Sequence, residues 1–93
     1  MKVNRFGMSQ KIFNDMFVHW YNTQNFIAQA LRHNGAKDEA LKKLSEANVI
    51  AAKTFRDGEE PFPMIEHRET NERLRNEINR ELSAQLEASA LSS

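Results

Sequence analysis

The sequence contains no cysteine in its 93 residues. This absence excludes disulfide bonds, thiolate zinc sites and cysteine nucleophiles, and it removes any need for an oxidising compartment. The basic first residues are followed by no apolar run, and no stretch approaches the roughly 20 apolar residues that cross a bilayer. The composition therefore favours a cytoplasmic protein with no membrane partner.

The sequence also lacks a net charge, because 13 Lys and Arg residues balance 13 Asp and Glu residues. A dedicated nucleic-acid coat would need a basic excess, so this balance argues against one. The charges are unevenly spread, since residues 1–35 carry four bases and one acid, whereas residues 58–93 carry four arginines and eight glutamates. The two ends can therefore attract each other, within one chain or between two antiparallel chains.

Only three glycines and two prolines are present, and they lie at the borders of long segments with helical periodicity. Gly35 and Gly58 follow two such segments, and Pro61 and Pro63 precede a third. Glycine is common just beyond a helix end, and proline near a helix start. No segment alternates apolar and polar residues in the manner of a strand. We therefore expect a single all-α domain over residues 1–93, with three helices built on an antiparallel helical hairpin.

The first helix is expected over residues 9–33, with the Ser9 side chain capping its first turn. A main apolar stripe with 4-3-4-3-4 spacing consists of Phe13, Phe17, Trp20, Gln24, Ile27 and Leu31. A second stripe beside it consists of Ile12, Met16, His19, Phe26 and Ala30. Together the stripes cover roughly 220° of the helix, which is more than one neighbouring helix can bury. Asn25 and Arg32 belong to the polar remainder, which is the part of this helix outside both apolar stripes.

A second helix is expected over residues 38–56, with acids in its first turn and bases near its last, as the helix dipole favours. Its core stripe contains small residues that allow a close approach to the first helix, and consists of Leu41, Leu44, Ala47, Asn48, Ala51, Ala52 and Phe55. Val49 and Ile50 each lie roughly 130° from the centre of this stripe. Packing within the hairpin therefore does not account for these two side chains.

The third helix is polar and is expected over residues 67–88, after a linker over 57–66 and before a frayed end over 89–93. Its apolar residues form a narrow i,i+4 series of Leu74, Ile78, Leu82 and Leu86. Charged pairs flank this series and stabilise the helix only slightly. We expect this helix to pack loosely on its own hairpin or to be shared between the two chains of a homodimer.

Three carboxylates, Glu66, Glu69 and Glu72, have the i,i+3 spacing that can chelate a divalent metal on one helix face. A metal-dependent hydrolase using them is one alternative function, but it would need facing acids, and the first helix offers only Asp15. Asp15 and His19 lie one helical turn apart, yet no nucleophile accompanies them. We therefore assign no catalytic residue, no metal and no cofactor.

A second alternative is a nucleic-acid-binding protein that uses the basic side chains of the second helix. These are Lys42, Lys43, Lys53 and Arg56. Such bases are suited to phosphate contacts, but Glu46 lies within the same face. No recognition helix follows a short turn, as a helix-turn-helix would require.

The surplus of apolar side chains is the strongest functional signal in the sequence. A contiguous exposed patch of such residues marks an interface. The candidate partner-binding residues are Ile12, Phe26, Val49, Ile50, Phe62 and Ile65. The function we favour is a small non-enzymatic module that regulates another protein, as an adaptor or inhibitor, by occluding or bridging it. Such compact modules are typical of phage and mobile-element products, and a homodimer would enlarge the small core.

Overall fold

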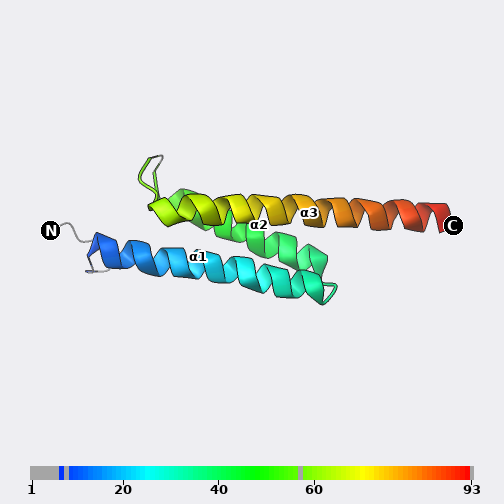
Figure 1. Cartoon of the computed structure of the whole chain (residues 1–93), viewed down its shortest axis with the longest axis horizontal. Helices are drawn as coiled ribbons and strands as arrows, with labels where there is room; N and C mark the ends of the chain where they lie inside the picture. The colour runs from blue at the N-terminus through cyan, green and yellow to red at the C-terminus, as the bar shows by residue number, and fades with distance from the viewer. Residues whose placement is uncertain (1–6, 8, 57, 93) are drawn as a thin grey trace.

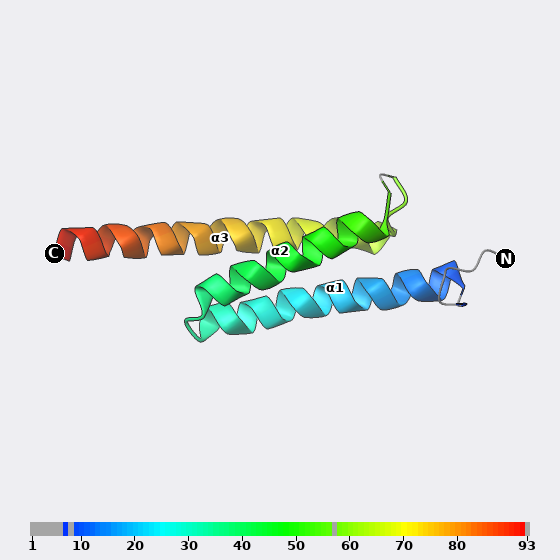
Figure 2. The same cartoon turned by 180° about the vertical axis from the view of Figure 1, so that it is seen from behind.

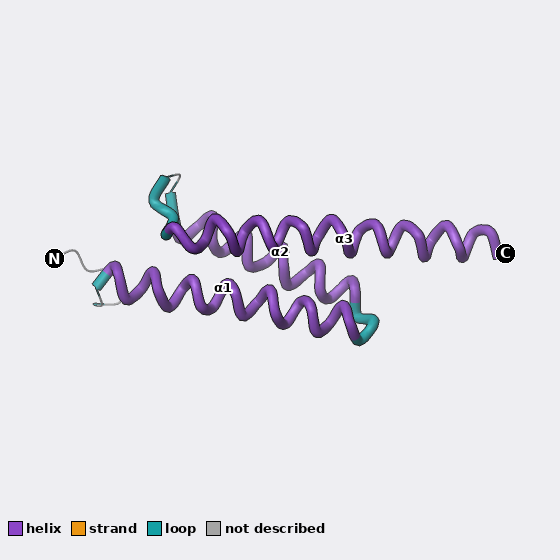
Figure 3. The backbone as a smooth tube through the Cα atoms, in the orientation of Figure 1, coloured by secondary structure: helices purple, strands orange, loops and turns teal. Residues whose placement is uncertain are grey.

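The computed structural model describes residues 7, 9–56 and 58–92, and these residues form three α-helices. Helix α1 spans Gln10–His33, α2 spans Lys37–Thr54 and α3 spans Phe62–Ser92 (Figure 1). The view from behind shows that α2 returns antiparallel to α1, and that α3 then runs in the direction of α1 (Figure 2). Short loops connect the helices at the two ends of α2 (Figure 3). The predicted all-α arrangement built on a hairpin is confirmed.

Helix α1 begins and ends where Ser9 and Gly35 predict. The Ser9 hydroxyl oxygen accepts a hydrogen bond from the backbone N–H of Ile12 at 3.2 Å, which satisfies one free donor at the start of α1. At the other end, the Ala36 N–H donates to the Leu31 carbonyl at 2.8 Å. Gly35 between them has φ +86°, the left-handed conformation that a glycine adopts without strain. The chain therefore reverses within three residues.

Helix α2 ends at Thr54, two residues before the predicted end. The reason is that Phe55 adopts an extended backbone with φ −118° and ψ 139°. This conformation buries its ring against α1, with its centroid 5.0 Å from that of Phe17 and 6.4 Å from that of Phe13. Phe55 therefore belongs to the core as predicted, but from outside the helix.

Both predicted ends of α3 are wrong. The helix begins at Phe62 rather than 67, because Pro63 falls in the first turn, where a missing N–H costs no hydrogen bond. It continues to Ser92 rather than 88, since neither glycine nor proline interrupts it. Residues 62–66 of the predicted linker and 89–92 of the predicted tail are thus helical, whereas Asp57 and Ser93 lie outside the described residues. Side chains 83–91 are all exposed, so the end of α3 projects beyond the hairpin (Figure 1).

The core consists of two apolar clusters along the bundle. The first contains Ala28, Ala40, Leu44, Leu74 and Ile78, and the second contains Tyr21, Ala47, Ala51 and Met64. Four alanines among these residues let the helix backbones approach closely. Helix α3 contributes to both clusters, so it packs on the hairpin of its own chain as far as Leu82. None of the helices, over the residues described, is long and apolar enough to cross a bilayer.

The buried face of α1 is turned by one residue from the predicted main stripe. Its fully buried residues are Tyr21, Asn25 and Ala28, whereas Ile27 of the predicted stripe is exposed. The cause is that α1 contacts α2 on one side and α3 on the other, so the buried face lies between the two contacts. Ala52 was predicted on the core stripe of α2 and Leu86 in the apolar series of α3. Both are exposed and lie outside the core.

Candidate functional site

One asparagine from each helix forms a polar layer between the two apolar clusters. The Asn48 amide donates to Asn71 Oδ1 at 2.8 Å. The Asn71 amide donates to Asn25 Oδ1 at 3.3 Å and to the Leu44 carbonyl at 3.1 Å. The Asn25 amide in turn donates to the His67 carbonyl at 3.0 Å. We call Asn25, Asn48 and Asn71 the asparagine layer.

The sequence indicated only one member of this layer. Asn48 was on the predicted core stripe of the second helix, whereas Asn25 was assigned to the polar remainder of the first. Asn71 was given no role, although it lies seven residues after Met64 and three before Leu74. This heptad-like spacing continues the apolar series of α3 and could have placed Asn71 in the core.

Tyr21 joins the asparagine layer from α1. Its hydroxyl donates to Asn48 Oδ1 at 2.5 Å, and the side chain is fully buried. Burial raises the pKa of Tyr21 to about 12, because the charged phenolate would lose its hydration. The guanidinium groups of Arg68 and Arg75 act in the opposite direction and offset only part of this rise.

Titration of the tyrosine gives a direct test, since Tyr21 is the one tyrosine in the sequence. We expect phenolate absorbance to appear with a midpoint near pH 12 in the folded protein, instead of the ordinary value of 10.0. Because the folded-state pKa is the higher one, the stability linked to Tyr21 is complete below pH 10.0 and is lost as pH rises towards 12. The chain in denaturant is the control, and a folded midpoint equal to the denatured one would contradict this assignment.

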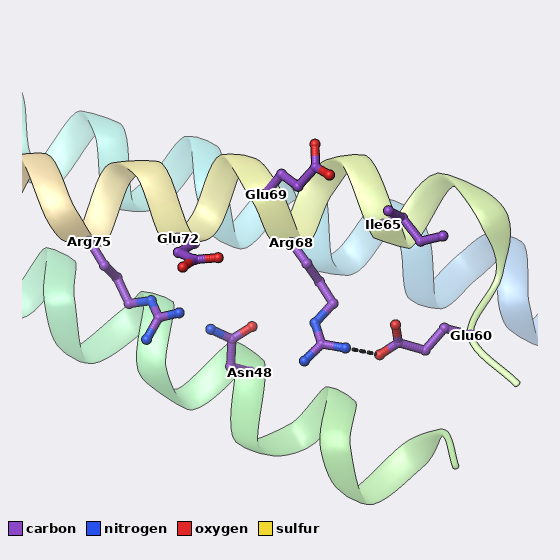
Figure 4. A pocket seen from close by; sticks show the side chains of 7 residues that line it. All are labelled: Asn48, Glu60, Ile65, Arg68, Glu69, Glu72 and Arg75. Carbon is purple, nitrogen blue, oxygen red and sulfur yellow. Dashed lines mark hydrogen bonds and ion pairs between the residues drawn. The ribbon is translucent and has the colours of Figure 1, made fainter. Parts of the chain in front are cut away.

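A polar cavity of about 300 Å³ lies beside the asparagine layer, between α2 and α3 (Figure 4). It is lined by Asn48, Glu60, Ile65, Arg68, Glu69, Glu72 and Arg75. Both arginines already have partners, because Arg68 forms an ion pair with Glu60 and Arg75 Nε donates to Asn71 Oδ1 at 2.9 Å. Three glutamates and two arginines are among these residues, and the Glu69 carboxylate points away from both guanidinium groups (Figure 4). The cavity thus borders the asparagine layer at Asn48 and does not concentrate one sign of charge.

The predicted carboxylate series is distributed over two surfaces. Glu72 lines the polar cavity, Glu66 lines a second hollow at the start of α3, and Glu69 lines both. Among residues 7, 9–56 and 58–92, no group of three or more Asp, Glu or His side chains is placed to hold a metal ion. Asp15 and His19 are both exposed on α1.

At the opposite end of the bundle, Arg32 of α1 binds two glutamates of α3. Its Nη1 lies 3.0 Å from Glu77 Oε2, and its Nη2 lies 2.5 Å from Glu81 Oε2. The hydrogen bonds from Arg32 lower the pKa of Glu81, and those bonds raise the pKa of Arg32 itself. Arg32 was predicted on the polar side of α1, outside both apolar stripes. In the structure it forms ion pairs that attach α3 to the hairpin.

This ion pair predicts an acid-sensitive contribution to stability. Because the folded-state pKa of Glu81 is lowered, its contribution is complete above the ordinary value of 4.5 and is lost as pH falls through the lowered pKa. We expect Arg32→Gln to melt below the unmodified protein at neutral pH, with the difference vanishing in acid and narrowing in 1 M salt. Arg73→Gln, an equal charge change on exposed α3 surface, serves as the control in thermal melts. A difference that persists unchanged in acid would contradict the prediction.

The basic residues of the second helix do not form a uniformly positive surface. Lys42 and Lys43 line a hollow of about 270 Å³ together with Leu31, Glu39 and Glu46. Lys53 and Arg56 are exposed further along the chain. Acidic side chains are thus interleaved with Lys42 and Lys43, as the position of Glu46 in the sequence indicated.

The second apolar stripe of α1 is an exposed surface. With Thr23 included, its residues repeat at 4-3-4-3-4 spacing, and all six are exposed. They are Ile12, Met16, His19, Thr23, Phe26 and Ala30, which we call the outer seam. None is an Asp, Glu, Lys or Arg. This is the spacing with which a helix packs against another helix at a shallow angle.

Helix α2 carries exposed apolar side chains of its own. Ile50 follows Ala47 by one turn, on the side of α2 that faces α1, and it is exposed. Val49 lies next to it, and the two line a hollow of about 330 Å³ that is mostly apolar. The structure therefore brings Ile12 and Phe26 of the predicted set onto one helix, with Val49 and Ile50 on its neighbour.

Phe62 and Ile65 form a separate patch at the start of α3. Both are exposed, Phe62 by 86%, and they line a hollow of about 320 Å³ with Pro63, Glu66 and Glu69. Phe62 lies on the side of α3 away from Met64 and Ile78, which face the core, whereas Ile65 also lines the polar cavity beside α2. The six predicted partner-binding residues are thus all exposed but divide between the hairpin and the first turns of α3.

Compared with protein-family models, with curated proteins and with solved structures, the chain matches none.

Proposed function

We propose that the protein is a small non-enzymatic protein-binding module, which docks a helix of another protein chain on its outer seam and so occludes or bridges that chain. The observation that supports this most strongly is the exposure of the outer seam. Its largest side chain, Phe26, is 66% exposed, although the seam has the spacing of a helix–helix contact. Apolar side chains gathered in this way on one face mark an interaction surface.

Binding of a helix would use the side chains of both hairpin helices. The outer seam supplies the contact along α1, and Ile50 with Val49 supplies a border along α2. Aromatic and long aliphatic side chains at the centre of such a contact carry most of the binding energy. Phe26 and Ile50 are therefore the side chains whose loss should weaken binding most.

The test compares capture by the unmodified protein with capture by Phe26→Asp and Ile50→Asp. We expect each variant to weaken binding of a protein captured from native cell extract by about 100-fold, because a carboxylate replaces a central apolar anchor. Affinity is then measured by calorimetry with the purified, identified protein. Gln29→Asp places the same charge on exposed α1 surface outside the seam and should bind normally. Full affinity of a folded Phe26→Asp variant would refute the proposal.

A further inference from the structure

We infer that the chain which occupies the outer seam is a second copy of this protein, with the two α1 helices packed antiparallel about a two-fold axis. This inference rests on the proposed function, because it names the partner of the same surface. It is carried by the order of residues along the seam, by the absence of full charges there and by the area that the seam exposes.

The order of the seam residues suits antiparallel pairing with itself. When the axis passes at the level of Tyr21, each seam position meets another seam position of the second copy. The resulting pairs are Ile12 with Ala30, Met16 with Phe26, and His19 with Thr23. Bulky or flexible apolar side chains then meet a small residue or a ring, and the two polar residues meet each other. In a parallel pair, Phe26 would meet Phe26 and His19 would meet His19.

The lack of full charges removes the main obstacle to self-association through one surface. In a two-fold interface the same patch is used by both copies, so a patch of one sign repels itself. The outer seam carries no Asp, Glu, Lys or Arg between Ile12 and Ala30. The charged residues of α1 lie elsewhere, with Arg32 engaged by α3 and with Lys11 and Asp15 beside the seam.

The exposed area is sufficient for a stable pair. Ile12 is 54% exposed, Met16 57% and Phe26 66%. With Ile27, Val49 and Ile50, the exposed apolar surface amounts to roughly 600 Å², against about 800 Å² per partner in a standard interface. His19, Thr23 and Ala30 supply much of the remainder. Pairing would place the two hairpins face to face, as a four-helix core with one α3 on each outer side.

A charge-swap experiment on the full chain tests both the partner and the direction of pairing. Phe26→Glu and Met16→Lys are expected to weaken the dimer about 100-fold each, as measured by sedimentation equilibrium. The double variant M16K/F26E is expected to recover dimerisation, because each new lysine faces the new glutamate of the other copy. An equimolar mixture of the two single variants should likewise associate more tightly than either alone. Gln29→Glu serves as the control, and circular dichroism verifies that each variant is folded.

The outcomes separate this inference from the proposed function. A protein that is monomeric at every concentration, or a dimer that survives both single variants, overturns the inference. Failure of the double variant to recover also overturns it. If the protein is monomeric and Phe26→Asp still abolishes binding of an identified partner, the inference fails while the proposed function stands. If Phe26→Asp affects neither dimerisation nor partner binding, both fail.

Discussion

Replacement of Asn71 by alanine is expected to lower the free energy of unfolding by about 3 kcal/mol, because it leaves buried polar groups without partners. Asn71 is fully buried and hydrogen-bonds to Asn25, Asn48, Arg75 and the Leu44 carbonyl. Asn25 and the Leu44 carbonyl would lose a bond in a site that water reaches poorly, whereas Asn48 and Arg75 line the polar cavity, where water can replace the lost bond. For a chain of this size the thermal midpoint should fall by about 15 °C, which circular dichroism would measure.

Two further variants give this prediction its controls. Asn79→Ala changes the same residue type on the exposed side of α3 and should leave the midpoint unchanged or slightly raised. Replacing the whole asparagine layer by leucine, together with Tyr21→Phe, should recover part of the lost stability, since neither a side-chain amide nor the Tyr21 hydroxyl is then left buried without its partner. If the Asn71→Ala and Asn79→Ala proteins had the same thermal midpoint, the asparagine layer would contribute nothing to stability.

Truncation of Ile78 to alanine is expected to cost about 3 kcal/mol, since the side chain is fully buried in the cluster formed with Leu44 and Leu74. The cost combines the lost burial of the side chain with the cavity left between α3 and the hairpin. Denaturant titration would report it as a lower midpoint with an unchanged slope.

The matched comparison is Leu86→Ala, two turns further along α3. Leu86 is 72% exposed, so its truncation should change the free energy of unfolding by less than about 0.5 kcal/mol. If the two variants lost similar stability, either α3 would not pack on its own hairpin at Ile78 or Leu86 would be covered in solution. Light scattering on the Leu86→Ala protein distinguishes these cases.

The sequence predicted helices, caps and the hairpin because these depend on local periodicity and on residues such as Ser9 and Gly35. It did not predict which part of the wide apolar arc of α1 is buried, since that depends on where two neighbours lie at once. Asn25 and Arg32 were assigned to the polar remainder for the same reason, because side-chain polarity alone does not reveal a partner on another helix. The start of α3 was predicted too late because Pro61 and Pro63 were assigned to a linker. Proline is compatible both with a linker and with the first turn of a helix.

The candidate site was predicted in part. Ile12, Phe26, Val49 and Ile50 were singled out because the hairpin could not bury them, and their exposure agrees with that reasoning. Phe62 and Ile65 were grouped with them, although they lie on a different surface. The separation could not be foreseen because it depends on the helical start of α3. That any of these residues binds a partner stays a prediction until variants are measured.

The three sections of α3 are held to the hairpin by different means, and this has a consequence for how the bundle opens. Around Asn71 and Leu74 the attachment is buried, at Ile78 it is buried beside the partly solvated ion pair of Arg32 with Glu77 and Glu81, and over residues 83–91 the side chains are exposed. Salt and acid weaken the ion pair but leave the burial of Leu74 and Ile78 in place. Opening of α3 should therefore start at its carboxyl end and stop at Ile78, so that the backbone amides of this one helix exchange with solvent at rates that fall from its carboxyl end inward.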